Sequence, residues 1–139
     1  MSTYKEIRRN IRSTLESVVE RTTAIKSTVI GEKYPPDYFP FAQVIPGPDT
    51  ISPDSSNSDQ HMMQYWITVV DEEENVITGL ESTIDLAADV YEDLAATHSL
   101  NGVVDELFID RFDPRYVIGE NYTLHWVLIQ LTCRKQIGR

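Results

Sequence analysis

The sequence predicts an α+β protein of one domain, residues 1–139, in which a four-stranded, mainly antiparallel sheet carries two helices on one face, in the order αββαββ. Two segments repeat apolar residues at three- to four-residue intervals, the period of a helix. Four further segments are short apolar or alternating runs typical of strands. The chain of 139 residues has the length of a single domain, which supports one core rather than two.

The first helix is predicted in the segment STYKEIRRNIRSTLESVVERTTA, residues 2–24. Its apolar residues recur at helical spacing: Tyr4, Ile7, Ile11, Leu15, Val18 and Val19. Thr3 followed by Glu6 is a capping-box pattern, which places the start of the helix near Thr3. The solvent side of the helix is predicted to carry three arginines: Arg8, Arg9 and Arg12. These arginines form either a solvated face or a partner-binding patch.

The first strand is predicted at Phe39 to Gly47, where Pro40 suits an edge or first-residue position. The next stretch, PGPDTISPDSSNSDQ from Pro46 to Gln60, is rich in Pro, Ser and Asp and has almost nothing to bury. It is predicted to be a long polar loop at 46–60. A loop of this length in a small domain is typically functional or disordered.

The second strand is predicted at His61 to Val70. Its alternation turns one set of residues toward the core: Met63, Tyr65, Ile67 and Val69. The acidic turn DEEEN separates this strand from the second helix, which is predicted within residues 77–99. That helix is expected to end near His98, because Asn101-Gly102 suits a left-handed turn.

The third strand is predicted at residues 103–112 and the fourth at Asn121 to Lys135. Both faces of the fourth strand are apolar, although two helices cover only one face of a sheet. The uncovered face is therefore predicted to be an oligomer or partner interface formed by Trp66, Tyr122, Leu124, Trp126 and Leu128. In the alternative, loops or the N-terminal segment cover this surface.

No catalytic constellation is predicted, and the protein is expected not to be an enzyme. Strand alternation turns Asp105 and Glu106 to opposite faces. Glu106 and Asp110 share a face but stand about 13 Å apart, too far for two carboxylates to hydrolyse a glycoside together. The histidines fall on three different elements: His61, His98 and His125. His125 is expected to be a buried imidazole rather than a base.

Neither a metal site nor a cofactor site is predicted. The one cysteine, Cys133, excludes an internal disulfide and is expected to be a packing residue at a strand end. Asp110, Asp113 and Glu120 in the segment DRFDPRYVIGEN match no calcium-loop spacing. The six glycines form no phosphate-binding loop.

The formal net charge is −10, so the surface as a whole repels phosphate and tight nucleic-acid binding is disfavoured. A repelling surface still allows a duplex to pass without sticking. No apolar run is long enough to span a membrane, and the N-terminus is charged rather than a signal sequence. A soluble protein of intracellular residence is expected.

Three features together resemble the tail terminator, or tail completion, proteins of long-tailed phages and related viruses. They are the order of the elements, the helix ESTIDLAADVYEDLAATHSLNG running into VVDELFID, and the closing strand YTLHWVLIQLTCRK. The resemblance spans most of the chain.

The resemblance implies a structural virion protein of the tail or neck, assembled in the host cytoplasm, with no catalysis and no cofactor. Such a protein forms a homo-oligomeric ring, typically a hexamer, that caps the tail tube and ends tail polymerisation. The implied partners are the tail tube protein and the head-tail connector protein, with genome DNA passing through the lumen and no membrane.

Two sets of residues gain candidate roles from this resemblance. Acids that repel passing DNA are expected at Asp71, Glu72, Glu73, Glu74, Asp110 and Asp113. The 46–60 loop is expected to act as an assembly arm through Asp49, Ile51, Asp54 and Asp59.

Two alternatives stay open at the level of sequence. One is another head-tail or tail adaptor protein of similar fold, which the sequence does not separate from a terminator. The other is a small soluble enzyme that uses Asp110, Asp113, Glu120 and His125 in a cleft, which predicts a monomer or dimer with a pocket and a perturbed carboxylate.

Overall fold

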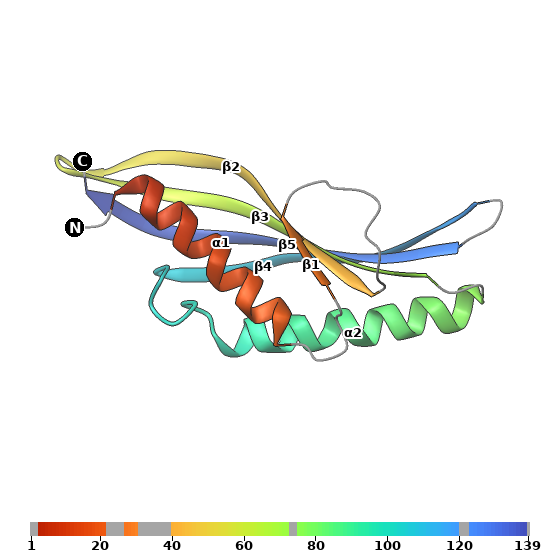
Figure 1. Cartoon of the computed structure of the whole chain (residues 1–139). Helices are drawn as coiled ribbons and strands as arrows, with labels where there is room; N and C mark the ends of the chain where they lie inside the picture. Colours follow the sequence, from red (N-terminus) through yellow and green to blue (C-terminus); the bar gives the residue numbers. More distant parts are fainter. Residues whose placement is uncertain (1–2, 22–26, 31–39, 73–74, 120–122, 139) are drawn as a thin grey trace.

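The computed structural model describes residues 3–21, 27–30, 40–72, 75–119 and 123–138. The elements follow one another as α1 (Tyr4–Glu20), β1 (Ser27–Ile30), β2 (Phe41–Ser55), β3 (Ser58–Glu72), α2 (Val76–Ala96), β4 (Glu106–Ile118) and β5 (Thr123–Gly138). Within these residues the strands form a five-stranded sheet in the order β1-β2-β3-β5-β4, and both helices lie on the same side of it (Figure 1). The predicted α+β class with two helices and four antiparallel strands is confirmed. The structure adds the short strand β1, which pairs with β2 in parallel.

Helix α1 begins where its capping residue predicts. The Thr3 side chain accepts a hydrogen bond from the Glu6 backbone N–H at 3.2 Å, which satisfies one of the free donors of the first turn. The buried stripe of the helix matches the predicted periodicity: Ile7, Ile11, Leu15, Val18 and Val19. Tyr4, the first residue of the predicted stripe, is 40% exposed.

The predicted long loop at 46–60 is wrong, because most of it is strand. Strand β2 continues to Ser55, a two-residue turn follows, and β3 begins at Ser58. Pairing with β3 supplies the hydrogen bonds that the polar composition did not reveal, with Ser52 opposite Gln60. Strand β1 pairs with β2 only as far as Val44, so beyond that point β2 has no described partner strand on the edge away from β3. Prolines are tolerated along such an edge, because a missing N–H directed to that side removes no hydrogen bond of the sheet. A register shift between Pro46 and Asp49 absorbs the Gly-Pro pair.

Helix α2 and strand β4 are joined by a tight left-handed turn. The helix ends at Ala96 with Thr97 as its C-cap, close to the predicted end. Leu100, Asn101 and Gly102 all have positive φ angles, of 49°, 59° and 87°. Asn and Gly tolerate this conformation, so the Asn101-Gly102 pair is what permits the chain to reverse here.

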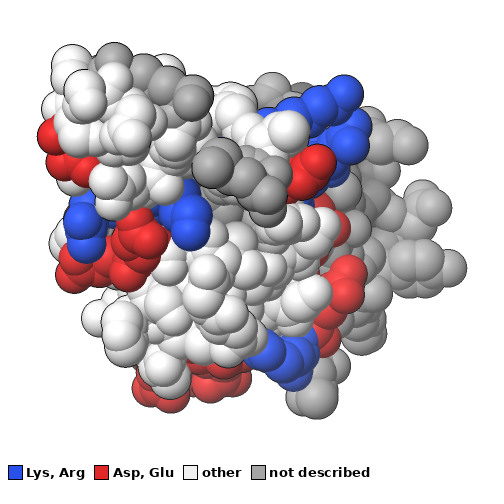
Figure 2. All heavy atoms as spheres, turned by 90° about the vertical axis from the view of Figure 1, so that its left-hand side faces the viewer, with Lys and Arg blue, Asp and Glu red and all other residues white. Residues whose placement is uncertain are grey.

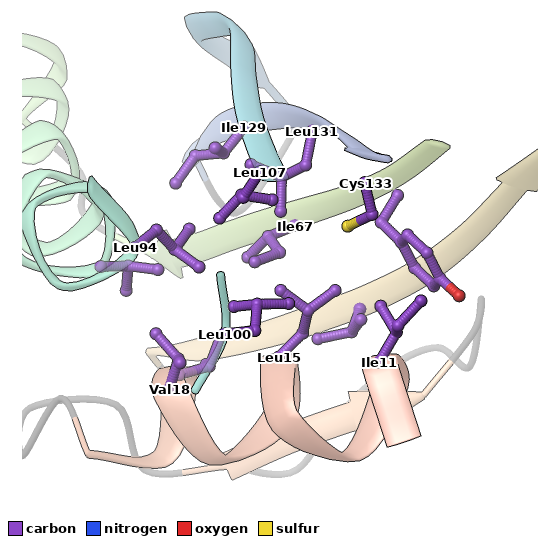
Figure 3. Packing of buried hydrophobic residues seen from close by; sticks show 14 of the residues in the cluster. Ile11, Leu15, Val18, Ile67, Leu94, Leu100, Leu107, Ile129, Leu131 and Cys133 are labelled. Carbon is purple, nitrogen blue, oxygen red and sulfur yellow. The ribbon is translucent and has the colours of Figure 1, made fainter. Parts of the chain in front are cut away.

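The core lies between the two helices and one face of the sheet, called the inner face below. Figure 3 shows α1 side chains directed toward those of the strands, with Ile11 and Leu15 among them. Along the middle of β5, alternate residues point to this face and are fully buried: Val127, Ile129, Leu131 and Cys133. The predicted core residues of β3 are buried too: Met63, Tyr65, Ile67 and Val69. The inner face therefore follows the two-residue period of the sequence.

Candidate assembly face

The face of the sheet turned away from the helices, called the outer face below, carries the predicted interface residues. Four of these residues are half-buried: Trp66 on β3, and Leu124, Trp126 and Leu128 on β5. Tyr122 lies outside the described residues. Their strand neighbours on the inner face are fully buried, so the two faces differ in exposure although both are apolar. The alternation of the sequence assigned these side chains to one face correctly.

The outer-face residues run along β5 and continue diagonally to Trp66 on β3. On β5, Leu124, Trp126 and Leu128 follow one another along one face, and Trp126 stands opposite Val70 of β3. Trp66 stands opposite Gln130, which is four residues farther along the strand than Trp126. Gln130 is two residues from Leu128, so at about 3.4 Å per residue Trp66 lies about 7 Å along the strands from Leu128 and about 14 Å from Trp126. We call Leu124, Trp126 and Leu128 the β5 patch.

Trp66 is held by its own chain. A Cβ added to Gly47 would lie 2.9 Å from two carbons of the Trp66 ring, so the indole rests against the backbone of the irregular part of β2. On the other side of the sheet, the carbonyl oxygen of Gly47 accepts a hydrogen bond from Arg8 Nη2 at 3.2 Å. Trp66 therefore covers a site where only glycine fits, and part of its apolar surface is already used within the chain.

One end of the outer face is closed to solvent. Phe41, Gln43 and Val70 belong to this face by register, yet they are 0%, 4% and 2% exposed. The alternative in which other parts of the chain cover the face therefore holds for this end. The β5 patch remains partly accessible beside it.

The edge of the outer face along β4 is charged. Asp113, opposite Leu128, forms ion pairs with Arg111 and Arg115, whose Nη2 atoms lie 3.2 Å and 2.9 Å from its Oδ2 atom. Because two arginines pair with this one carboxylate, Asp113 contributes little repulsion toward DNA. The sequence showed an acid here but not the pairing that neutralises it.

The other candidate DNA-repelling acids are differently placed. Glu72 is exposed and Asp71 partly exposed at the end of β3, while Glu73 and Glu74 lie outside the described residues. Asp110 is exposed and accepts a hydrogen bond from the Thr132 hydroxyl on the outer face. Three of the described candidates form no ion pair with the described residues, which leaves their negative charge uncompensated in that part of the chain: Asp71, Glu72 and Asp110.

Asp49, predicted as an exposed assembly residue, is instead the centre of a buried polar cluster. Its Oδ2 atom lies 2.6 Å from His61 Nδ1 and accepts a hydrogen bond from the Tyr4 hydroxyl at 2.9 Å. The side chains of Asp49 and His61 are each 8% exposed. This cluster ties the start of α1 to β2 and β3, which the sequence did not indicate because the three residues are far apart in the chain.

The other predicted arm residues do remain at the surface. Ile51 is 55% exposed, Asp54 is exposed and Asp59 is partly exposed. They lie on the β2 and β3 hairpin, so any role in assembly belongs to a folded strand pair rather than to a free loop.

Burial perturbs two groups beneath α1. Desolvation raises the pKa of the Tyr65 phenol to about 12, although the nearby Arg8 guanidinium opposes this shift. Desolvation also raises the pKa of the Cys133 thiol to about 12, again against Arg8. The Arg8 guanidinium carbon lies 5.0 Å from the Tyr65 ring centroid. Cys133 is therefore an unreactive, protonated packing residue at neutral pH, in agreement with its predicted role.

The residues named for the enzyme alternative do not converge. His125 is fully buried on the inner face, while Asp113 and Asp110 lie toward the outer face. Glu120 lies outside the described residues. A sheet separates the imidazole from the two carboxylates, so these three groups do not act on one substrate.

No group of three or more His, Cys, Asp or Glu side chains in the described part of the chain is placed to hold a metal ion. Among the same residues, no helix is long and apolar enough to cross a membrane.

Comparison with known proteins adds little. No protein-family model matches the chain, and no curated protein matches it. A similar solved structure is a chain from the virion of a native gene transfer agent particle, with a TM-score of 0.44 and 15% sequence identity. The match covers 94% of this chain and 92% of that chain.

Proposed function

We propose that the protein is a structural virion protein whose outer face is buried against other subunits on assembly. The observation that carries this proposal is the β5 patch, in which Leu124, Trp126 and Leu128 remain partly exposed on a sheet face that no described helix covers. Aromatic and aliphatic side chains grouped in this way are typical of protein interfaces. Burying apolar area gains about 25 cal/mol per Å², so the patch favours association over exposure.

The finer role follows the sequence resemblance. The protein forms a homo-oligomeric ring, expected to be a hexamer, that caps the tail tube, ends tail polymerisation and joins the tail to the head connector. Its partners are further copies of itself, the tail tube protein and the head-tail connector protein, in the tail or neck of the virion. Genome DNA passes through the lumen, where uncompensated acids such as Asp71 and Glu72 prevent adhesion. The protein performs no catalysis in this role.

Light scattering combined with negative-stain imaging of the purified chain tests this proposal. We expect a ring, and we expect Trp126→Ala with Leu128→Ala to abolish it while the melting temperature stays close to that of the wild type. Thr68→Ala is the matched control, because Thr68 lies on the same face opposite Leu128 but contributes little apolar area. A compact monomer in which Trp66→Ala and Trp126→Ala change only solubility would overturn the proposal.

A second candidate, another head-tail or tail adaptor of similar fold, shares the same apolar face. The two candidates differ in where the protein sits. Labelled protein added to isolated tail tubes binds the tube end if it is a terminator, and binds the head connector alone if it is an adaptor of the head side.

A further inference from the structure

The two helices carry opposite charges although they pack on the same face of the sheet. Helix α1, Tyr4–Glu20, contains four basic and three acidic residues. Helix α2, Val76–Ala96, contains five acidic residues and no Lys, Arg or His. In a chain of net charge −10, α1 is therefore slightly basic and α2 strongly acidic.

The basic residues of α1 form one stripe, which we call the basic stripe: Lys5, Arg8, Arg9 and Arg12. Spacings of three and four residues place them on one side of the helix over about 10 Å. They line a hollow of about 350 Å³ together with Tyr4, Pro46 and Tyr65. Figure 2 looks onto the end of the molecule at which α1 begins and shows Lys and Arg side chains reaching the surface there.

Half of the basic stripe forms no polar contact with the described part of the chain. Arg8 donates to the carbonyl of Gly47, and Arg12 lies 3.7 Å from Glu16. Lys5 and Arg9 are exposed, and neither forms an ion pair or side-chain hydrogen bond with the described residues. Their charge is therefore available to a partner.

The acids of α2 form a matching stripe, which we call the acidic stripe: Glu81, Asp85, Asp89 and Glu92. All four are exposed, and within the described part of the chain none of them forms an ion pair. Their spacing keeps them on one side of the helix over about 16 Å. Beside them runs an apolar hollow of about 350 Å³, lined by Ile84, Ala88, Tyr91 and Phe112.

From this arrangement we infer that the basic stripe of one copy docks on the acidic stripe of a second copy. The charges are complementary in sign, the acidic stripe is long enough to receive the whole basic stripe, and like charge elsewhere on the surface disfavours other orientations. Exposed ion pairs by themselves contribute little to association. The apolar hollow next to the acidic stripe adds apolar area that is buried at the centre of the contact. Within one chain, the described ion pair between the helices joins Arg21 to Asp93 and uses neither stripe.

The contact joins two different surfaces, so it is heterologous. Each copy offers a basic stripe to one neighbour and an acidic stripe to the other, and such contacts close into a ring or continue as a filament. The contact between the two stripes does not depend on the proposed function, which names only the outer face as an assembly surface. The closure of these contacts into a ring does rest on the proposed function.

Charge reversal of each stripe tests this inference in the full-length chain. One variant carries Lys5→Glu with Arg9→Glu, and the other carries Asp85→Lys with Asp89→Lys. Sedimentation velocity at low salt, about 50 mM, measures self-association, which salt screens at higher concentrations. We expect each variant alone to associate at least tenfold more weakly than the wild type. A 1:1 mixture is expected to restore association, because the reversed basic stripe then faces the reversed acidic stripe. Glu20→Lys, a reversal of an exposed acid outside both stripes and outside the β5 patch, is the control for a charge change elsewhere on the surface and is expected to associate like the wild type.

The outcomes separate the inference from the proposed function. Reversal variants that associate like the wild type, a mixture without rescue, or a wild type that stays monomeric at millimolar concentration and low salt each overturn the inference. Loss of association with Trp126→Ala, together with unchanged association in the reversal variants, overturns the inference while leaving the proposed function standing. A mobility shift of duplex DNA by the wild type that Lys5→Glu with Arg9→Glu removes, without any change in self-association, assigns the basic stripe to phosphate instead.

Discussion

The two faces of the same sheet carry similar apolar residues and differ in what covers them. On β5, Ile129 and Val127 of the inner face are fully buried beneath the helices, whereas Trp126 and Leu128 of the outer face are half-buried. Strand alternation decides which residues share a face. The layer packed on a face decides whether its residues stabilise the fold or remain available for association.

The largest expected effect separates the two faces directly. Ile129→Ala removes a fully buried side chain from the inner face, and we expect a loss of about 3 kcal/mol in the free energy of unfolding. Leu128→Ala, one residue away on the outer face, is expected to cost less than about 1 kcal/mol in the same measurement and to weaken association instead. Urea unfolding of both variants measures this difference. Equal losses of stability would show that the outer face is core as well.

The polar cluster at the edge of the inner face gives the next effect. Asp49→Ala leaves the Tyr4 hydroxyl and His61 Nδ1 without their shared acceptor, and we expect a loss of about 2 kcal/mol. Asp54→Ala is the matched control on the same hairpin, because Asp54 is exposed, and it is expected to change stability by less than about 0.5 kcal/mol. If the two variants melt alike, the cluster contributes nothing to the attachment of α1.

Gly47 contacts Trp66 of the outer face and Arg8 of the inner side. A methyl group at this position is expected to displace the Trp66 ring. The added Cβ would stand 2.9 Å from the indole ring, so Gly47→Ala should cost about 1 to 2 kcal/mol and shift the tryptophan emission. In a Trp66→Val background the same change is expected to cost much less, which a double-mutant cycle measures. An additive cycle would contradict the contact.

Alkaline pH is expected to weaken the inner face gradually. Because burial raises the pKa of Cys133 from 9.0 and that of Tyr65 from 10.0 to about 12 each, the folded chain holds both protons more tightly than the unfolded chain does. Stability is therefore complete below about pH 9 and falls as the pH rises toward 12, by about 1 kcal/mol per pH unit for each group. Cys133→Val should flatten the decline between pH 9 and 10, where the thiol alone contributes. Parallel declines in the variant and the wild type in urea unfolding would count against this account.

The helices and the central strands were predictable because their signals are local. The apolar spacing of α1, its Thr3 cap and the left-handed turn at Asn101-Gly102 each depend on residues close together in the chain. The same holds for alternation in β3 and β5, from which the apolar outer face follows without knowledge of strand order.

The contacts between distant residues were not predictable in this way. The hairpin at 46–60 depends on pairing between β2 and β3, which overrides a composition typical of loops. The Asp49 cluster joins residues from α1, β2 and β3, and the two arginines around Asp113 become its partners only when β4 is extended.

The sequence by itself determined which side chains share a helix stripe or a strand face, since periodicity is set by backbone geometry. It also determined the opposite charges of the two helices. Only the tertiary structure decided which of these surfaces remain available: α1 and α2 cover the inner face, Gly47 receives Trp66, and the β5 patch stays half-buried. Burial depends on the layer that packs against a residue, and that layer comes from distant parts of the chain.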